Sequence, residues 1–437
     1  MANTKLIRTP SSASNRKKFT ISLWFKIGRH PFTDGAGGDS RELIGQTSSS
    51  YFRFMIQSSG TIRFYDQSGF NYITNRKFRD KSAWYHATLR VDTTQSTAND
   101  RVRLYINGVD ERTVGGYSTD SKPSQNQDFA WNITAVHQVG GHSNNYDYFS
   151  GVMSDVVQVD GQSLAPTSFG ETDPDTGEWR IKDLTSSSFT WGTNGFMILH
   201  NGNTITDQSS NSNNFSLQSG TLTKTEDTPS NNFATMNPLI PSQTNYTYSH
   251  GNTTITQGSA AWVKSNSTLG MTSGKYYWEA KYVSGLYTVV GVDKTDTATP
   301  YPSTSTSAVG WKRNGNVEVA TTPQTDIATY AHGDIVSIAL DMDNNCVYFG
   351  KGGVWQNSGN PTSGSSKTGA YSLPIANSTY FATVSPYSGG ATSMNFGNGY
   401  FGTTAVASAG TNASGNGIFE YDVPTGYTAL STKGLNI

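Results

Sequence analysis

Residues 140–148 gather side chains that proteins use to bind sugars. The run is Gly-Gly-His-Ser-Asn-Asn-Tyr-Asp-Tyr, which sets aromatic rings beside amides and a carboxylate. Aromatic faces pack on sugar rings, and amides or carboxylates bond to sugar hydroxyls. Two shorter stretches, 387–390 and 398–401, share part of this chemistry. The predicted glycan-binding residues are His142, Asn144, Asn145, Tyr146, Tyr148, Tyr387 and Tyr400. Ordinary hairpin tips have a similar composition, so this alternative stays open for each stretch.

Acidic residues that could cleave a polysaccharide are harder to find. That chemistry needs two carboxylates facing one cleft. Asp341 and Asp343 alternate along one expected strand, but their positions are equally those of a strand end and its turn. The acidic run 171–178 contains Pro174 and Gly177, a turn composition. The sequence has neither paired histidines at helical spacing nor a Gly-x-Ser-x-Gly motif. No catalytic residue is predicted, and the chain is interpreted as a non-enzymatic protein.

The elements that position these residues are strands. Apolar residues alternate with polar ones in 20–28, 52–56, 102–106 and 336–342. A period of two is typical of half-buried antiparallel strands. Turn signals such as Asn107-Gly108 and Asn314-Gly315 separate them, and no stretch keeps a helical period over three turns. The predicted fold class is all-β, with two jelly-roll sandwiches in tandem.

The composition of the chain excludes several classes of binding partner. The net charge of -1 provides no basic surface for nucleic acid or an anionic membrane. The sequence has no apolar run of 18 residues, so membrane insertion is not expected. The N-terminal segment lacks the apolar core of a signal peptide, and the single cysteine, Cys346, excludes an intramolecular disulfide. We expect a protein made in a bacterial cytoplasm that reaches the outside by lysis or assembly.

The first region resembles laminin-G-like domains of the concanavalin A type. Four stretches match that family's strands in order, namely 19–25, 84–92, 101–108 and 149–156. The resemblance implies that His86 is a packed structural residue. It also implies a rim site where Asp and Asn oxygens bind Ca²⁺, for which Asp147 and Asp155 are the predicted ligands. Hydrogen-bonded turns explain these two residues as well, and no other cofactor is expected.

The last region resembles a SPRY domain, another concanavalin-like sandwich. The stretch Gly-Lys-Tyr-Tyr-Trp-Glu at 274–279 is similar to that family's opening strand, and later strands follow in family order at 289–292, 309–311, 333–343, 347–354, 381–385 and 394–397. The predicted domains are a laminin-G-like jelly roll at 1–170, an ordered polar connector at 171–244, and a SPRY-like jelly roll with a closing segment at 245–437.

The combination of these parts, with the intervening 169–179, 192–196 and 232–238, resembles a mosaic found in proteins of marine and cyanobacterial phages. The resemblance implies a virion protein of the tail-fibre or surface-appendage type. It would attach to a host-surface glycan or to other virion proteins, as a homo-oligomer. The alternatives are a purely architectural decoration of the capsid or tail, and a polysaccharide-cleaving hydrolase or lyase.

Overall fold

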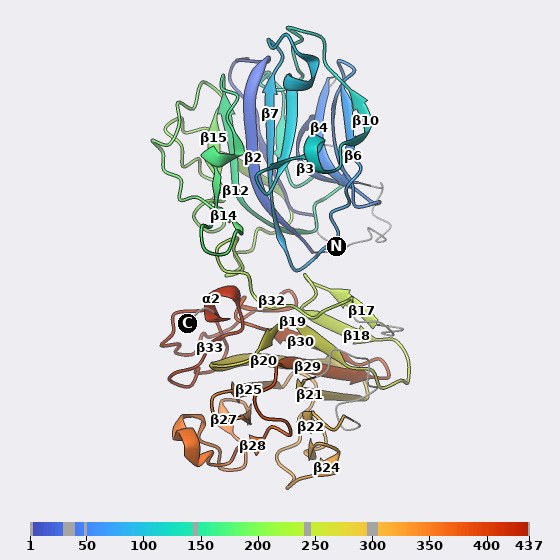
Figure 1. Cartoon of the computed structure of the whole chain (residues 1–437), viewed down its shortest axis with the longest axis vertical. Coiled ribbons are helices and arrows are strands. Elements are labelled where there is room, and N and C mark those ends of the chain that lie inside the picture. The colour runs from blue at the N-terminus through green and yellow to red at the C-terminus, as the bar shows by residue number, and fades with distance from the viewer. Residues whose placement is uncertain are drawn as a thin grey trace. The chain divides into compact units, whose positions relative to one another are not determined.

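The chain forms two compact units in the computed structural model, Met1–Lys224 and Thr225–Ile437 (Figure 1). The structure describes residues 3–28, 40–47, 50–142, 147–239, 246–294 and 305–435. Helices in these ranges are short: α1 (Glu111–Val114), α2 (Thr432–Leu435) and the 3-10 turns η1 (Ala98–Asp100), η2 (Pro166–Ser168) and η4 (Pro361–Ser366). None of these described helices is long and apolar enough to cross a membrane.

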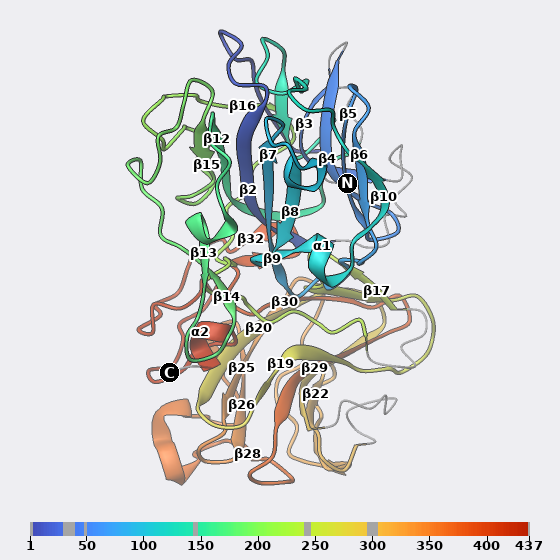
Figure 2. The same cartoon turned by 45° about the horizontal axis from the view of Figure 1, so that its top comes forward.

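Unit 1 is a sandwich of two antiparallel sheets. Its eight-stranded sheet has the order β10 (Tyr117–Ser121), β6 (Asn71–Thr74), β5 (Ile62–Asp66), β4 (Tyr51–Gln57), β3 (Ser40–Thr47), β11 (His137–Val139), β1 (Lys5–Arg8), β16 (Ser216–Ser219). Its six-stranded sheet has the order β15 (Phe196–Ile198), β12 (Gly151–Asp160), β2 (Lys18–Ile27), β7 (Trp84–Asp92), β8 (Val102–Ile106), β9 (Val109–Asp110). A separate hairpin pairs β13 (Gly170–Thr172) with β14 (Trp179–Ile181). Figure 2 shows β2, β7 and β8 in one layer and β4, β5 and β6 in the other.

The period of two in the sequence produces the core of unit 1. Ile21, Leu23 and Phe25 point from the six-stranded sheet into one apolar cluster, and Phe52 and Phe54 enter it from the other sheet. The predicted Asn107-Gly108 turn joins β8 to β9, with positive φ at both residues. Glycine is needed at 108 for a second reason, because a Cβ there would lie 2.5 Å from the ring of Trp179.

Unit 2 is a second sandwich. Its larger sheet has the order β17 (Tyr246–Ser249), β18 (Thr254–Gln257), β30 (Ala391–Asn395), β20 (Lys275–Ser284), β25 (Ile335–Asp341), β26 (Cys346–Lys351), β27 (Val354–Trp355), with β28 (Tyr371–Ser372) on β26 and β33 (Thr428–Ala429) on β20. The other sheet has the order β19 (Ser265–Met271), β29 (Tyr380–Tyr387), β21 (Tyr287–Asp293), β22 (Val309–Lys312), β23 (Val317–Val319), β24 (Thr322–Pro323). A small hairpin joins β31 (Tyr400–Phe401) and β32 (Thr404–Ala405). Side chains of both large sheets, including Trp278 and Trp311, fill its core. The predicted all-β fold with two tandem sandwiches is confirmed.

The segment 171–244, predicted as a connector, is divided between the two units. β15 pairs with β12, and β16 pairs with β1, so the segment up to Lys224 supplies edge strands to unit 1. Beyond it, Phe233 forms a bridge with Ser431, and Met236 forms one with Ser267. Several apolar residues of this segment, including Phe196, Phe215 and Met236, are buried in the sandwich cores, which explains their presence among so many polar ones.

Candidate binding surfaces

The outer face of the eight-stranded sheet carries two tyrosines and two arginines. Because Phe52 and Phe54 point into the core, their neighbours on β4 point the other way. The tyrosine face consists of Tyr51, Arg53, Arg63, Tyr65 and Asn71. The ring centroids of Tyr51 and Tyr65 are 5.4 Å apart, and the side chain of Tyr51 is 38% exposed. These strands thus display rings on the side of the sheet that faces away from the core.

Two guanidinium groups contact Tyr65, one at its ring and one at its hydroxyl. The Arg63 guanidinium carbon lies 4.0 Å from its centroid, a cation–π contact. Arg63 Nε also donates to the Asn71 amide oxygen at 3.0 Å. Arg53 Nη1 donates to the Tyr65 hydroxyl at 3.2 Å. The face is therefore pre-organised, with few rotamers to fix when a ligand arrives.

Buried charges fix the edge of this face. Arg53 Nε donates to Glu42 at 2.6 Å, and its Nη2 donates to Asp147 at 2.7 Å. Gln138 donates to the other Glu42 oxygen at 2.8 Å. Burial raises the pKa of Glu42 to about 7, against the lowering effect of Arg53. One guanidinium thus joins β3, β4 and the 140–148 loop. Neither Glu42 nor Arg53 was predicted from the sequence.

Side chains of β1 and β4 hold the described parts of the 140–148 loop. Lys5 Nζ donates to the His142 carbonyl at 3.0 Å, and burial lowers the pKa of His142 to about 4. Tyr148 is half-buried and lies against Gly141, where a Cβ would come within 2.8 Å of its ring. The predicted ligands Asn144, Asn145 and Tyr146 lie outside the described residues. Of the predicted loop residues, the structure thus places His142 in the interior and Tyr148 at the surface.

The two predicted calcium ligands are engaged in different contacts. Asp147 pairs with Arg53, and Asp155 accepts a bond from His200 Nδ1 at 2.5 Å, which raises the pKa of His200. Both residues have positive φ, as in turns and bulges. Among the residues that the structure describes, no three His, Cys, Asp or Glu side chains are grouped as metal ligands. Calcium binding at either residue stays a prediction.

The carboxylates weighed for catalysis also have structural partners. Arg180 bridges Glu171 and Asp173 on the β13–β14 hairpin, with N–O distances of 2.9 and 2.7 Å. Asp341 pairs with Lys275 at 3.0 Å, and Asp343 caps the Gly274 amide at 2.7 Å. The hairpin itself is held by Trp179, whose indole donates to His86 Nδ1 at 3.0 Å. His86 is fully buried, and burial lowers its pKa to about 3, which agrees with the packed role predicted for it.

Unit 2 carries a second aromatic surface. Trp262 stacks on Tyr387 with centroids 4.4 Å apart, and it lies 6.0 Å from Tyr287. The Arg313 guanidinium carbon is 5.2 Å from the Tyr287 centroid. Leu286, next along the chain, is 53% exposed. We call Trp262, Leu286, Tyr287, Arg313 and Tyr387 the tryptophan patch.

Only one residue of the tryptophan patch, Tyr387, was predicted from the sequence. Tyr400, the other predicted residue of unit 2, is half-buried on β31 opposite Ala405. The alternation of polar and apolar residues could have identified two further residues of the tyrosine face. Tyr51 and Tyr65 occupy polar-side positions of alternating strands, where a ring has no core to fill. Trp262 lies outside any strand and had no such signal.

Comparison with known proteins agrees with the first region's predicted family. Residues 2–163 match the concanavalin A-like lectin/glucanases superfamily, in its laminin-G group. No curated protein matches the chain. Similar solved structures include the SPRY domain of human HERC1, with 20% identity, TM-score 0.27, and coverage of 32% of this chain and 87% of that one. The PSpry domain of TRIM65 has 11% identity, TM-score 0.29 and coverage of 37% and 88%. Stonustoxin has 16% identity and TM-score 0.28, and the match covers 37% of this chain and 27% of the toxin. At its N-terminal end the chain is thus similar to concanavalin A-like lectins and glucanases over residues 2–163.

Proposed function

We propose that this chain is a non-enzymatic adhesion protein whose tyrosine face binds a host-surface saccharide. The observation that carries the proposal is the Tyr51–Tyr65 pair with Arg63 fixed 4.0 Å from the Tyr65 ring. Rings offer apolar faces to sugar C–H groups, while guanidinium and amide groups bond to hydroxyls. Asn71 supplies such an amide on the neighbouring strand. The predicted loop residue Tyr148 adds a ring beyond the Arg53–Asp147 anchor.

A glycan array with the full chain tests this function. Wild-type protein should bind a defined subset of bacterial surface glycans, and Tyr65→Ala should weaken that signal because the central ring is gone. Tyr105→Ala is the matched control, since Tyr105 is a half-buried tyrosine on β8 of the other sheet. Equal binding by wild type and Tyr65→Ala would eliminate the tyrosine face as the glycan site.

The tryptophan patch favours a second, protein-directed role. Tryptophan, tyrosine and arginine are the side chains that dominate binding energy at protein interfaces. Leu286, which is 53% exposed, adds apolar surface that sugars use poorly. We propose that this patch docks on another protein of the same assembly. Cross-linking in the intact assembly should join residues around Trp262 to a neighbouring protein, and Trp262→Ala should remove that cross-link.

We further propose that the assembly is a phage particle, with the chain in a tail fibre or surface appendage. The support is the mosaic resemblance of the whole sequence, together with one face suited to glycans and another suited to proteins. A map of the intact particle tests it. The proposal expects the tyrosine face to be open to solvent. A chain enclosed on all sides by other virion proteins, with no binding to host surfaces in isolation, would favour the architectural role instead.

A further inference from the structure

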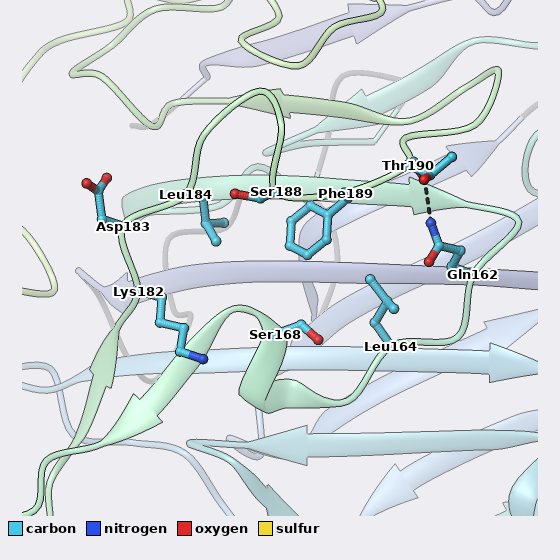
Figure 3. Close-up of a pocket in the computed structure, with 9 residues that line it drawn as sticks. All are labelled: Gln162, Leu164, Ser168, Lys182, Asp183, Leu184, Ser188, Phe189 and Thr190. Atoms are coloured by element: carbon cyan, nitrogen blue, oxygen red, sulfur yellow. Dashed lines mark hydrogen bonds between the residues drawn. The ribbon is translucent and has the colours of Figure 1, made fainter.

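A separate groove lies on unit 1 beside the β13–β14 hairpin. Its volume is about 540 Å³, within the range of small-ligand sites. Figure 3 shows Leu164 and Phe189 pointing into its centre, with Gln162 and Thr190 at one end and Lys182 near the other. No residue of the tyrosine face lines it. The groove therefore offers a binding site of its own.

The floor of the groove is rigid. The half-buried ring of Phe189 packs on Phe169 and Trp191, with both centroid distances 5.1 Å. Phe169 and Trp191 belong to a satellite apolar cluster with Val157 and Val159 of β12. The Trp191 indole donates to the Ser186 carbonyl at 2.6 Å, which holds the loop before Phe189. The exposed part of the ring is thus a fixed apolar platform.

Polar groups surround this platform. Gln162 uses its amide nitrogen on the Thr190 carbonyl at 2.6 Å, and its amide oxygen remains an acceptor. Ser168 contributes a hydroxyl that no other described side chain engages. Lys182 donates to the Thr167 carbonyl at 2.6 Å and keeps two further N–H groups. Asp183 also lines the groove, but its carboxylate is directed away from Phe189 in Figure 3, and its side chain is 95% exposed.

We propose that this groove binds an acidic saccharide unit. A sugar ring would lay its C–H face on Phe189, and its hydroxyls would meet Gln162 and Ser168. Its carboxylate would pair with Lys182. A purely apolar ligand would offer no acceptor to the two remaining ammonium N–H groups and no donor to the Gln162 amide oxygen. A neutral sugar could bond to these groups but would not compensate the positive charge of Lys182, so a uronate fits the groove best.

The test uses the full chain and three soluble probes: tetragalacturonate, its methyl ester, and N-acetyl-phenylalaninamide. Calorimetry would give each affinity, and saturation-transfer NMR would show which sugar protons contact the protein. Phe189→Leu keeps an apolar side chain but removes the ring, and we expect it to weaken tetragalacturonate binding by roughly threefold to tenfold. Lys182→Gln should weaken tetragalacturonate by roughly twofold to fivefold and leave the methyl ester unchanged.

Lys77→Gln is the matched control, because Lys77 is an exposed lysine of unit 1 outside the groove and the tyrosine face. Equal affinities of wild type, Phe189→Leu and Lys182→Gln for tetragalacturonate would overturn the proposal. So would binding of N-acetyl-phenylalaninamide in place of the uronate, which would make the groove a peptide site. Tyr65→Ala in the same titration separates the two surfaces. A uronate lost only in Tyr65→Ala would overturn the groove and leave the tyrosine face standing.

Discussion

The tyrosine face of unit 1 and the tryptophan patch of unit 2 reach similar compositions by different means. In unit 1, Arg53 couples two buried carboxylates, Glu42 and Asp147, beneath the exposed rings. In unit 2, Trp262 stacks directly on Tyr387, and Arg313 lies at the rim. Buried ion pairs hold the first surface in place, and stacking between aromatic rings holds the second.

This difference determines how much folding stability a substitution on each surface should cost. Removing one member of a buried ion network leaves an unpaired charge in the interior, whereas removing a half-exposed ring loses only its contacts. We therefore expect the tyrosine face to be tied to the stability of unit 1. The tryptophan patch should tolerate substitution with little effect on folding.

The largest expected effect is that of Arg53→Met. The change leaves Glu42 and Asp147 without their shared cation, which should cost about 3–5 kcal/mol in the opening free energy of unit 1. Arg313→Met is the matched change in unit 2, and it should cost below about 1 kcal/mol. Hydrogen exchange resolved by peptide measures both, because it reports the units separately. Similar losses in the two variants would break the comparison.

The stability of the two units should also depend differently on pH. Burial lowers the pKa of His86 to about 3 and of His137 to about 4, both in unit 1. The unfolded pKa of a histidine is about 6.5, so each of these side chains takes up a proton at higher pH in the unfolded state than in the folded state. Their contribution to stability is therefore complete above about pH 6.5 and is lost as the pH falls toward the folded pKa. His142, whose pKa burial lowers to about 4, is a third such group in unit 1, and the three together remove about 4 kcal/mol per pH unit between about pH 6 and pH 4.

The buried carboxyls act in the opposite direction, and burial raises the pKa of Glu42, Asp66 and Glu111 in unit 1 and that of Glu279 in unit 2. Burial raises the pKa of Glu42 and of Glu279 to about 7, so each favours the folded state as pH falls from 7. Hydrogen exchange between pH 6.5 and 4 should therefore show unit 1 weakening more than unit 2. The double variant His86→Gln, His137→Gln should reduce the difference, because only His142 of the three histidines remains, and an unchanged slope would contradict the assignment.

Ligand binding gives the next effect. Tyr65→Ala should weaken saccharide binding by about 0.5–1.5 kcal/mol, which is the energy of an aromatic contact beyond its buried area. Trp262→Ala should leave saccharide affinity unchanged while removing the protein contact of unit 2. Titration calorimetry with the glycan identified on the array measures both. A loss in Trp262→Ala equal to that in Tyr65→Ala would mean that the surfaces do not divide their ligands.

The smallest expected effect is that of Arg63→Lys. Lysine keeps the positive charge but lacks the planar group that lies over Tyr65 and bonds to Asn71. We expect a loss of about 0.5 kcal/mol in saccharide binding and no change in exchange rates of β4 and β5. A loss as large as that of Tyr65→Ala would show that Arg63 is itself a main contact.

The strands and the two sandwiches were predictable because alternation and turn residues are local signals. Phe52 and Phe54 mark the buried side of β4, and Asn107-Gly108 marks a tight turn. The Arg53 network was not predictable, because its hydrogen bonds join residues that lie 94 and 96 positions apart in the chain. The strand pairing within 171–224 was not predicted for the same reason, since edge pairing such as that of β16 with β1 depends on the finished sheet.

The central claim is that the tyrosine face holds the host-surface saccharide, at a site separate from the groove proposed for an acidic saccharide unit. Hydrogen exchange of the full chain with and without the array-selected glycan tests it most directly. We expect protection on β4, β5 and the segment around Asp147 and Tyr148, and reduced protection there in Tyr65→Ala. Protection spread over β2, β7 and β8 with none on β4 and β5 would contradict it.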